Sequence, residues 1–146
     1  MDHYVSVNRD ELKAVLDMEG ITPQAYTFDG GHPPETYVLS ITPGGWAVYY
    51  SERGLESGRQ DFDTEDAACN HLLSLLRRDD TVHFEMVVGP LPADEADRQF
   101  RAWSERHGLS LTEHDIRVDN PILQQGKVRR YWVRGTILRR LPSVEP

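Results

Sequence analysis

A two-residue period of apolar side chains runs through residues 36–62 and constrains the fold more than any other feature. Apolar residues alternate with polar or smaller ones in two runs, one on each side of the linker Thr42–Gly45. Such alternation is typical of strands, and the linker has Pro and Gly where a type II turn takes them, so we predict a hairpin. After a polar segment at 52–58, the run Arg59–Phe62 can pair as a third antiparallel strand and complete a meander.

Three segments carry helix signals, at 8–20, 63–78 and 92–107. Asn8 and Glu11 form a capping box at the start of the first segment, ahead of an apolar stripe. Asp63 can cap the second, which opens with acidic residues and ends with basic ones, as the helix dipole favours. Pro92 fits the first position of the third. We therefore predict three helices.

The remaining segments are less regular. Thr81–Val88 is rich in β-branched and aromatic residues and predicts a strand that Gly89-Pro90 stops. Residues 109–126 predict a loop with one short strand, and Val128–Leu138 predicts a strand with a bulge or bend at Gly135. The order α, βββ, α, β, α, β indicates an α+β fold, with a mixed or antiparallel sheet, a central β-meander and about three helices packed on it.

The composition indicates an ordinary cytoplasmic domain. A chain of 146 residues with 38% hydrophobic content can form its own core, so we predict a single α+β domain over 1–146. The one cysteine, Cys69, excludes an internal disulfide and suits a reducing compartment. The N-terminus lacks the pattern of a secretory signal, and no run of eighteen apolar residues occurs. We expect a cytoplasmic protein without a membrane partner.

The formal net charge of −8 is unevenly distributed. Residues 1–116 hold nine basic and 22 acidic side chains, a net of −13, whereas residues 117–146 hold seven and two, a net of +5. In one interpretation the basic segment folds back onto the acidic body; in the other, two faces have different partners. Because the chain as a whole is acidic, we expect no nucleic-acid partner.

Signals for catalysis or cofactor binding are weak. Cys69 lies in the middle of a predicted helix beside its apolar stripe, so we expect it in the core. The run His83-Phe84-Glu85 lacks the paired cysteines of a zinc deaminase site, and the other histidines have no ligand-like spacing. The glycines form no phosphate-binding motif. We expect no enzymatic activity, no cofactor and no metal.

Two surface patterns point to binding instead. Arg129–Arg134 interleaves basic and aromatic residues, as a platform for single-stranded nucleic acid does, but both faces of such a strand are mixed. That mixture favours a partly covered strand whose arginine heads meet acidic groups. Acidic residues near aromatic ones suit the capture of a basic protein. The candidate contacts are Trp46, Tyr49, Glu52, Glu56, Asp61, Asp63, Asp94, Glu95 and Asp97.

Five runs carry a resemblance to a known class of protein. They are Y-V-L (37–39), P-G-G-W-A-V-Y-Y-S-E-R-G (43–54), F-D-T-E-D-A-A-C (62–69), L-L-S-L-L (72–76) and D-E-A-D-R-Q-F-R-A-W (94–103). Together they resemble small bacterial immunity proteins encoded beside polymorphic secreted toxins. The resemblance implies stoichiometric inhibition, in which a cytoplasmic protein binds its cognate toxin domain and blocks the active site. It transfers no catalytic or toxin-contacting residue to this chain.

Our first hypothesis is therefore a non-enzymatic immunity protein that neutralises a cognate toxin through its acidic surface. Two alternatives stay open. One is a small enzyme or ligand-binding α+β domain with a pocket near His83, Glu85 and Tyr131. The other is a nucleic-acid-binding regulator that uses residues 127–140.

Overall fold

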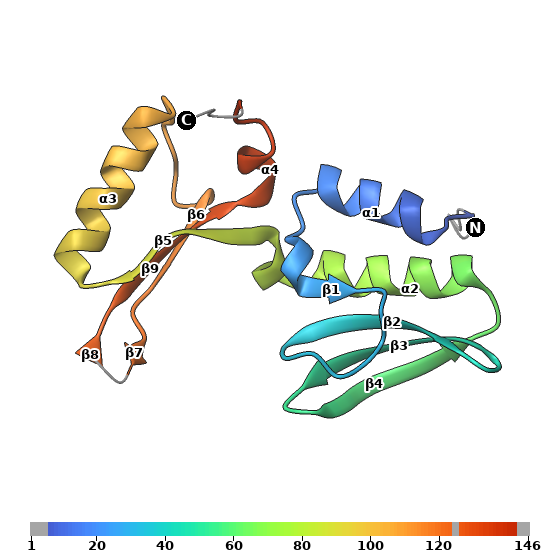
Figure 1. The fold of residues 1–146 in the computed structure, drawn as a ribbon. Helices are drawn as coiled ribbons and strands as arrows, with labels where there is room; N and C mark the ends of the chain where they lie inside the picture. The colour runs from blue at the N-terminus through green and yellow to red at the C-terminus, as the bar shows by residue number, and fades with distance from the viewer. Residues whose placement is uncertain (1–5, 124–125, 143–146) are drawn as a thin grey trace. The chain divides into compact units, whose positions relative to one another are not determined.

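The computed structural model describes residues 6–123 and 126–142. Contacts divide the chain into two compact units, Met1–Val82 (unit 1) and His83–Pro146 (unit 2), and each is described by itself (Figure 1). Both units contain helices and strands, which confirms the predicted α+β class. The described strands are distributed over separate sheets, and no sheet combines strands of both units.

Unit 1 is a four-stranded sheet with two helices. Its elements are α1 (Arg9–Met18), the 3-10 helix η1 (Pro23–Ala25), β1 (Tyr26–Thr27), β2 (Thr36–Thr42), β3 (Gly45–Glu52), β4 (Leu55–Phe62) and α2 (Glu65–Arg78). The sheet order is β1-β2-β3-β4, so β4 is an edge strand. The β2-β3-β4 meander is antiparallel as predicted, and the short β1 is parallel to β2, which makes the sheet mixed.

Side-chain caps determine where both helices begin. The predicted capping box is confirmed: Asn8 Oδ1 accepts from the Glu11 N–H at 2.8 Å, and the Asn8 N–H donates to Glu11 Oε1 at 3.1 Å. The cap of α2 is Thr64, whose Oγ1 accepts from the Ala67 N–H at 3.3 Å, and not Asp63. Since β4 continues through Phe62, it is Thr64 that has the extended backbone an N-cap needs.

Both hairpin turns differ from the prediction. A type II turn needs a positive φ at Gly44, but the positive φ lies at Gly45, where a Cβ would collide with the carbonyl oxygen of Phe62. The expected polar loop 52–58 is a two-residue turn, Arg53-Gly54, in which both residues have positive φ (53° and 77°), as in type I′. The longer β4 was not predicted because its side chains show no apolar alternation.

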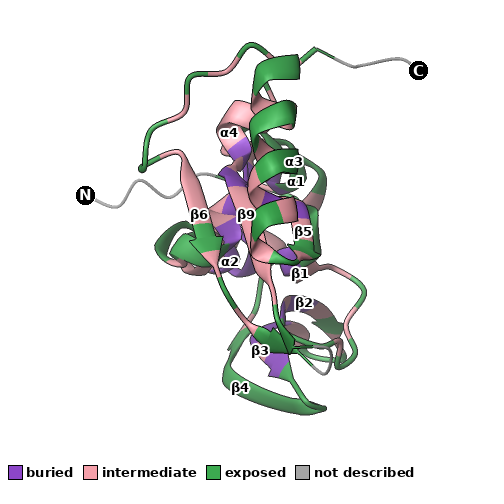
Figure 2. Cartoon of the chain, turned by 90° about the vertical axis from the view of Figure 1, so that its left-hand side faces the viewer, coloured by how far each residue is buried: buried purple, intermediate pink, exposed green. Residues whose placement is uncertain are grey.

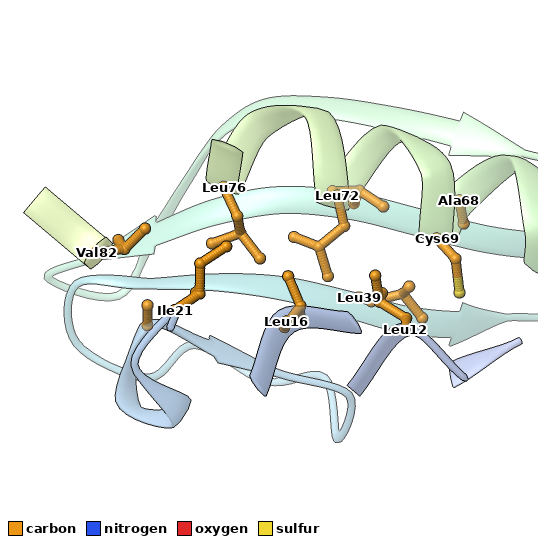
Figure 3. Close-up of a cluster of buried hydrophobic side chains, with 11 residues drawn as sticks. Leu12, Leu16, Ile21, Leu39, Ala68, Cys69, Leu72, Leu76 and Val82 are labelled. Atoms are coloured by element: carbon orange, nitrogen blue, oxygen red, sulfur yellow. The ribbon is translucent and has the colours of Figure 1, made fainter. Parts of the chain in front are cut away.

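The core of unit 1 lies between the helices and one face of the sheet (Figure 3). α2 packs against β2, β3 and β4, and α1 packs against α2. The fully buried members are Leu12 and Leu16 of α1, Ile21 in the segment after α1, Leu39 and Val48 of the sheet, and Ala68, Cys69, Leu72 and Leu76 of α2. The core position predicted for Cys69 is confirmed, and burial raises the pKa of its thiol to about 11. That thiol is a packing group.

Unit 2 is a smaller assembly around a three-stranded antiparallel sheet. After the 3-10 helix η2 (Asp80–His83), its elements are β5 (Phe84–Leu91), α3 (Ala93–Arg106), β6 (Ile116–Asp119), β7 (Ile122–Leu123), β8 (Gly126–Lys127), β9 (Arg129–Arg134) and α4 (Gly135–Leu138). The sheet order is β5-β9-β6, and β7 and β8 pair separately. α3 packs against β5 and β9.

Two predictions for unit 2 are corrected. Gly89-Pro90 does not stop β5, because β5 is an edge strand, where proline is tolerated. Glycine is required at position 89, since a Cβ there would lie 2.5 Å from the carbonyl oxygen of Arg129. At the other end of the chain, Gly135 begins the helical turn α4 instead of bending a longer strand.

Across 6–123 and 126–142, none of the helices has the length and apolar character needed to cross a membrane.

The core assignment predicts contrasting effects of two leucine truncations. Leu72→Ala removes a fully buried side chain, and we expect the free energy of unfolding of unit 1 to fall by about 2–5 kcal/mol. Leu55→Ala, at a side chain that is 73% exposed, should change it by less than about 0.5 kcal/mol. Urea denaturation followed by circular dichroism measures both. Equal effects of the two variants would contradict the assigned core.

Candidate functional site

The acidic excess of the chain belongs to unit 1. Residues 1–82 hold six basic and 15 acidic side chains, a net of −9. Residues 83–146 hold ten basic and nine acidic side chains, a net of +1. A surface that attracts cationic partners is therefore to be sought on unit 1.

The basic C-terminal segment meets carboxylates of its own unit. Arg129 Nη1 donates to both oxygens of Asp97 at 2.8 Å, and Arg139 donates to both oxygens of Glu85 at 3.0 and 3.1 Å. Arg130 pairs with Asp119 in the same way. Within the strand, Arg129 and Arg130 meet acidic groups as the mixed pattern predicts, whereas Arg134 donates to the carbonyl oxygen of His114.

Tyr131 and Glu85, which the enzyme alternative would use, have different partners. The Tyr131 hydroxyl donates to Asp97 Oδ1 at 2.6 Å, and its ring stacks on Phe100 with centroids 4.2 Å apart. This hydrogen bond, together with that from Arg129, holds the pKa of Asp97 below its usual range. Glu85 is held by Arg139 instead, so each of these two side chains is engaged by a different neighbour within unit 2.

The face of the unit 2 sheet that carries Phe84 is built from arginine–aromatic stacks. The guanidinium groups of Arg117 and Arg134 lie 5.0 and 4.7 Å from the centroid of the Phe84 ring, and Arg130 lies 5.4 Å from that of Trp132. Aromatic rings that are stacked on arginines have that part of their surface covered, so stacking with bases would require these contacts to open.

On unit 1, the sheet face opposite α2 carries a compact polar and aromatic cluster. Tyr49 of β3 is its centre: the hydroxyl donates to the carbonyl oxygen of Gly31 at 2.6 Å, and the residue is only 3% exposed. The rings of Tyr49 and His32 lie 6.1 Å apart, and the Arg59 guanidinium lies 5.7 Å from the Tyr49 centroid. Tyr49 therefore supports the loop and the arginine above it.

Glu56 of β4 connects the charged members of this cluster. Its carboxylate accepts from Arg59 Nη1 at 3.0 Å and lies 3.1 Å from His32 Nε2, and Arg59 Nε also lies 3.4 Å from Asp61 Oδ1. The hydrogen bond from Arg59, with that from His32, holds the pKa of Glu56 below its usual range. We call these five residues, His32, Tyr49, Glu56, Arg59 and Asp61, the Glu56 cluster.

The nine predicted contact residues divide between the units. Asp94, Glu95 and Asp97 lie on α3 of unit 2. In unit 1, Glu52, Glu56, Asp61 and Asp63 are exposed and lie along or beside β4. Figure 2 shows β4 in the colour of exposed residues. Trp46 and Tyr49 lie on opposite faces of β3, because they are three positions apart. Trp46 packs on the core beneath Arg9, whose guanidinium lies 5.0 Å from the ring centroid.

Three residues near this surface were missed by sequence reasoning. Leu55 was assigned to a polar loop, but it is 73% exposed at the start of β4. Together with Glu52, Arg53, Glu56 and Ser57 it lines a shallow depression. The Arg53-Gly54 pair was a signal for the tight turn that places Leu55. The position of Arg59 beside Glu56 follows from the strand register that this turn sets. No local pattern predicts the contact of His32, the third missed residue, with Glu56, which lies 24 positions away.

The charged and hydroxyl groups of the Glu56 cluster are engaged by neighbours within unit 1. Among the described residues there is no group of three or more His, Cys, Asp or Glu side chains that could hold a metal ion. The carboxylate of Glu56 is engaged by two neighbours, and the hydroxyl of Tyr49 by a backbone carbonyl. The result is a fixed pattern of charge along an exposed strand.

Neither a family model, a curated protein nor a solved structure matches this chain.

The Glu56 cluster predicts a specific change in titration. Arg59→Gln removes the largest cause of the lowered pKa of Glu56, so we expect that pKa to rise towards its ordinary value in a ¹³C NMR titration. Because the folded pKa is lowered, the contribution of this carboxylate to stability is present above the unfolded pKa. It is lost as the pH falls through the folded pKa.

Arg53→Gln serves as the matched control, because Arg53 is an exposed arginine of the same hairpin. It should leave the Glu56 titration unchanged. If Arg59→Gln also left it unchanged, the contacts described for Glu56 would be incorrect.

Proposed function

We propose that this chain is a non-enzymatic immunity protein that binds a cognate secreted bacterial toxin domain in the cytoplasm and neutralises it. The toxin would contact unit 1 along the β3–β4 hairpin. The observation that carries the proposal is β4 itself, a strand of which seven of eight residues are exposed and which holds its charges in fixed positions.

Charge supports a cationic partner. Unit 1 has a net charge of −9, and four acidic residues lie on or beside this hairpin: Glu52, Glu56, Asp61 and Asp63. Complementary fields accelerate encounter and suppress the association of like-charged molecules. A toxin domain with a basic surface is therefore the partner that this hairpin would attract.

Shape and polarity support a protein partner. Leu55 is an exposed apolar side chain in a shallow depression whose other lining residues are polar or charged. Protein interfaces commonly have a buried apolar contact surrounded by a polar rim that excludes water. Leu55 would supply the buried contact, and Glu52 and Glu56 would form part of the rim.

The resemblance to immunity proteins agrees with this location. The run 43–54 forms the β2–β3 turn, β3 and the β3–β4 turn. The run 62–69 joins the end of β4 to the first turns of α2. The resemblance therefore concerns the framework that presents β4, while residues 55–61 of β4 lie outside the resembling runs.

The proposal predicts that charge reversal on this hairpin weakens toxin binding. The partner to assay is the C-terminal domain of the protein encoded by the adjacent gene, mixed with the full chain in isothermal titration calorimetry. Glu52→Lys combined with Asp63→Lys should reduce affinity at least tenfold, about 1.4 kcal/mol, with a greater loss at low salt. Co-expression should show a parallel loss of protection against growth arrest by the toxin.

Glu105→Lys combined with Glu113→Lys is the matched control, because both residues are exposed in unit 2 and the two substitutions together make the same charge change as the hairpin variant. It should bind like the parent chain. Failure of the parent chain to bind the adjacent gene product would refute the proposed function. Equal losses for the control and the hairpin variant would instead move the contact away from β4.

A further inference from the structure

The outer side of β4 is an open edge with regularly placed backbone groups. β4 is the last strand of the sheet, and its only strand partner among the described residues is β3. An edge strand presents N–H and C=O groups that can template pairing with another chain. The positions of these groups follow from the register of the hairpin.

The two-residue turn Arg53-Gly54 fixes which groups point outward. Residues flanking such a turn, here Glu52 and Leu55, form a closely spaced pair that exchanges hydrogen bonds, and the pairs then alternate along the ladder. In the pairs Ser51–Glu56 and Ala47–Asp61, the backbone groups of the β4 residue therefore point away from β3. The β2–β3 hairpin, with its own two-residue loop, requires the same alternation in β3.

Among the β4 residues that have a pairing partner on β3, the two whose backbone faces the open edge are thus both acidic. Glu56 and Asp61 also have their side chains on the same sheet face, since their partners Ser51 and Ala47 are four positions apart on β3. Arg59 lies between them and contacts both carboxylates, which leaves this trio with a net charge of −1. The Asp61 side chain is 72% exposed.

We propose that β4 binds an extended basic strand of the partner by strand addition, so that the partner continues the sheet of unit 1. The added strand would carry Lys or Arg at two positions four residues apart, opposite Glu56 and Asp61. The β3–β4 register shifts between Val48 and Tyr50, where β4 has one more residue than β3. The spacing of four is kept, because the partners of Glu56 and Asp61 on β3 are four positions apart. This inference rests on the proposed function and specifies how the same hairpin holds its partner.

Charge argues against a second copy of this chain as the occupant. In the two-fold antiparallel register that overlaps the whole of β4, Glu56 lies opposite Asp61 in both halves. Like charges directly opposite each other destabilise a strand pair. The two carboxylates that would discourage self-pairing are those that would attract a basic strand.

Amide hydrogen exchange on the ¹⁵N-labelled full chain tests the inference without any substitution in the protein. In the complex with the toxin domain, the Glu56 and Asp61 amides should exchange at least tenfold more slowly than in the free chain. The Ser57 and Gln60 amides point towards β3 and should be protected in both states, so they serve as internal controls.

A pair of substitutions distinguishes the contribution of the Asp61 backbone N–H to binding from that of the Asp61 carboxylate. Asp61→Ala removes the charge and keeps the outward N–H, whereas Asp61→Pro removes both and leaves the bonds to β3 intact. Asp61→Pro should bind the toxin domain at least tenfold more weakly than Asp61→Ala. If the proline variant does not fold, hydrogen exchange on the parent chain decides the question.

Each outcome has a defined meaning. Binding without added protection of Glu56 and Asp61, or with equal affinity for the two variants, overturns strand addition and leaves the proposed function standing. Absence of binding overturns both. Protection of these amides in the free chain at high concentration, with a doubled mass, would assign the edge to a second copy and overturn the basic-strand assignment.

Discussion

Unit 1 depends on the burial of one face of its sheet beneath α2. The apolar side of α2, which includes Leu72 and Leu76, packs onto Leu39 of β2 and Val48 of β3, and α1 adds Leu12 and Leu16 to the same layer. Each of these side chains is fully buried. Because the apolar residues of the meander are concentrated in β2 and β3, the core needs few apolar side chains from β4. That strand is free to carry charge, and its pairing to β3 is enough to hold it in place.

Unit 2 is organised by different forces. Its described core contains few fully buried apolar residues, and much of its surface is held by arginines that either pair with carboxylates or stack on aromatic rings. Pairing of this kind needs both members within the same small unit. It explains why the cationic end of the sequence coincides with a nearly neutral unit, and why the acidic excess resides in unit 1.

The sequence was informative where a local pattern has one physical solution. The Asn8–Glu11 box, the β2–β3 hairpin and the buried Cys69 follow from capping geometry, two-residue periodicity and position on a helix. The length of β4 was underestimated, because an edge strand that is exposed on both faces needs no apolar alternation. Tyr49 was expected to be an anchor for the partner because aromatic residues often are, but it is covered by the loop at Gly31. Its contact with His32 is a tertiary one that no local pattern encodes.

The length of the Arg53-Gly54 turn restricts which sequence changes this hairpin can accept. Its length sets the parity of the whole β3–β4 ladder, because one added or lost residue would exchange the backbone groups that face β3 with those that face outward. Substitutions along β4, by contrast, change exposed side chains and leave that parity intact. New recognition properties can therefore accumulate on β4 residue by residue with little cost to folding, provided that the turn keeps its two residues.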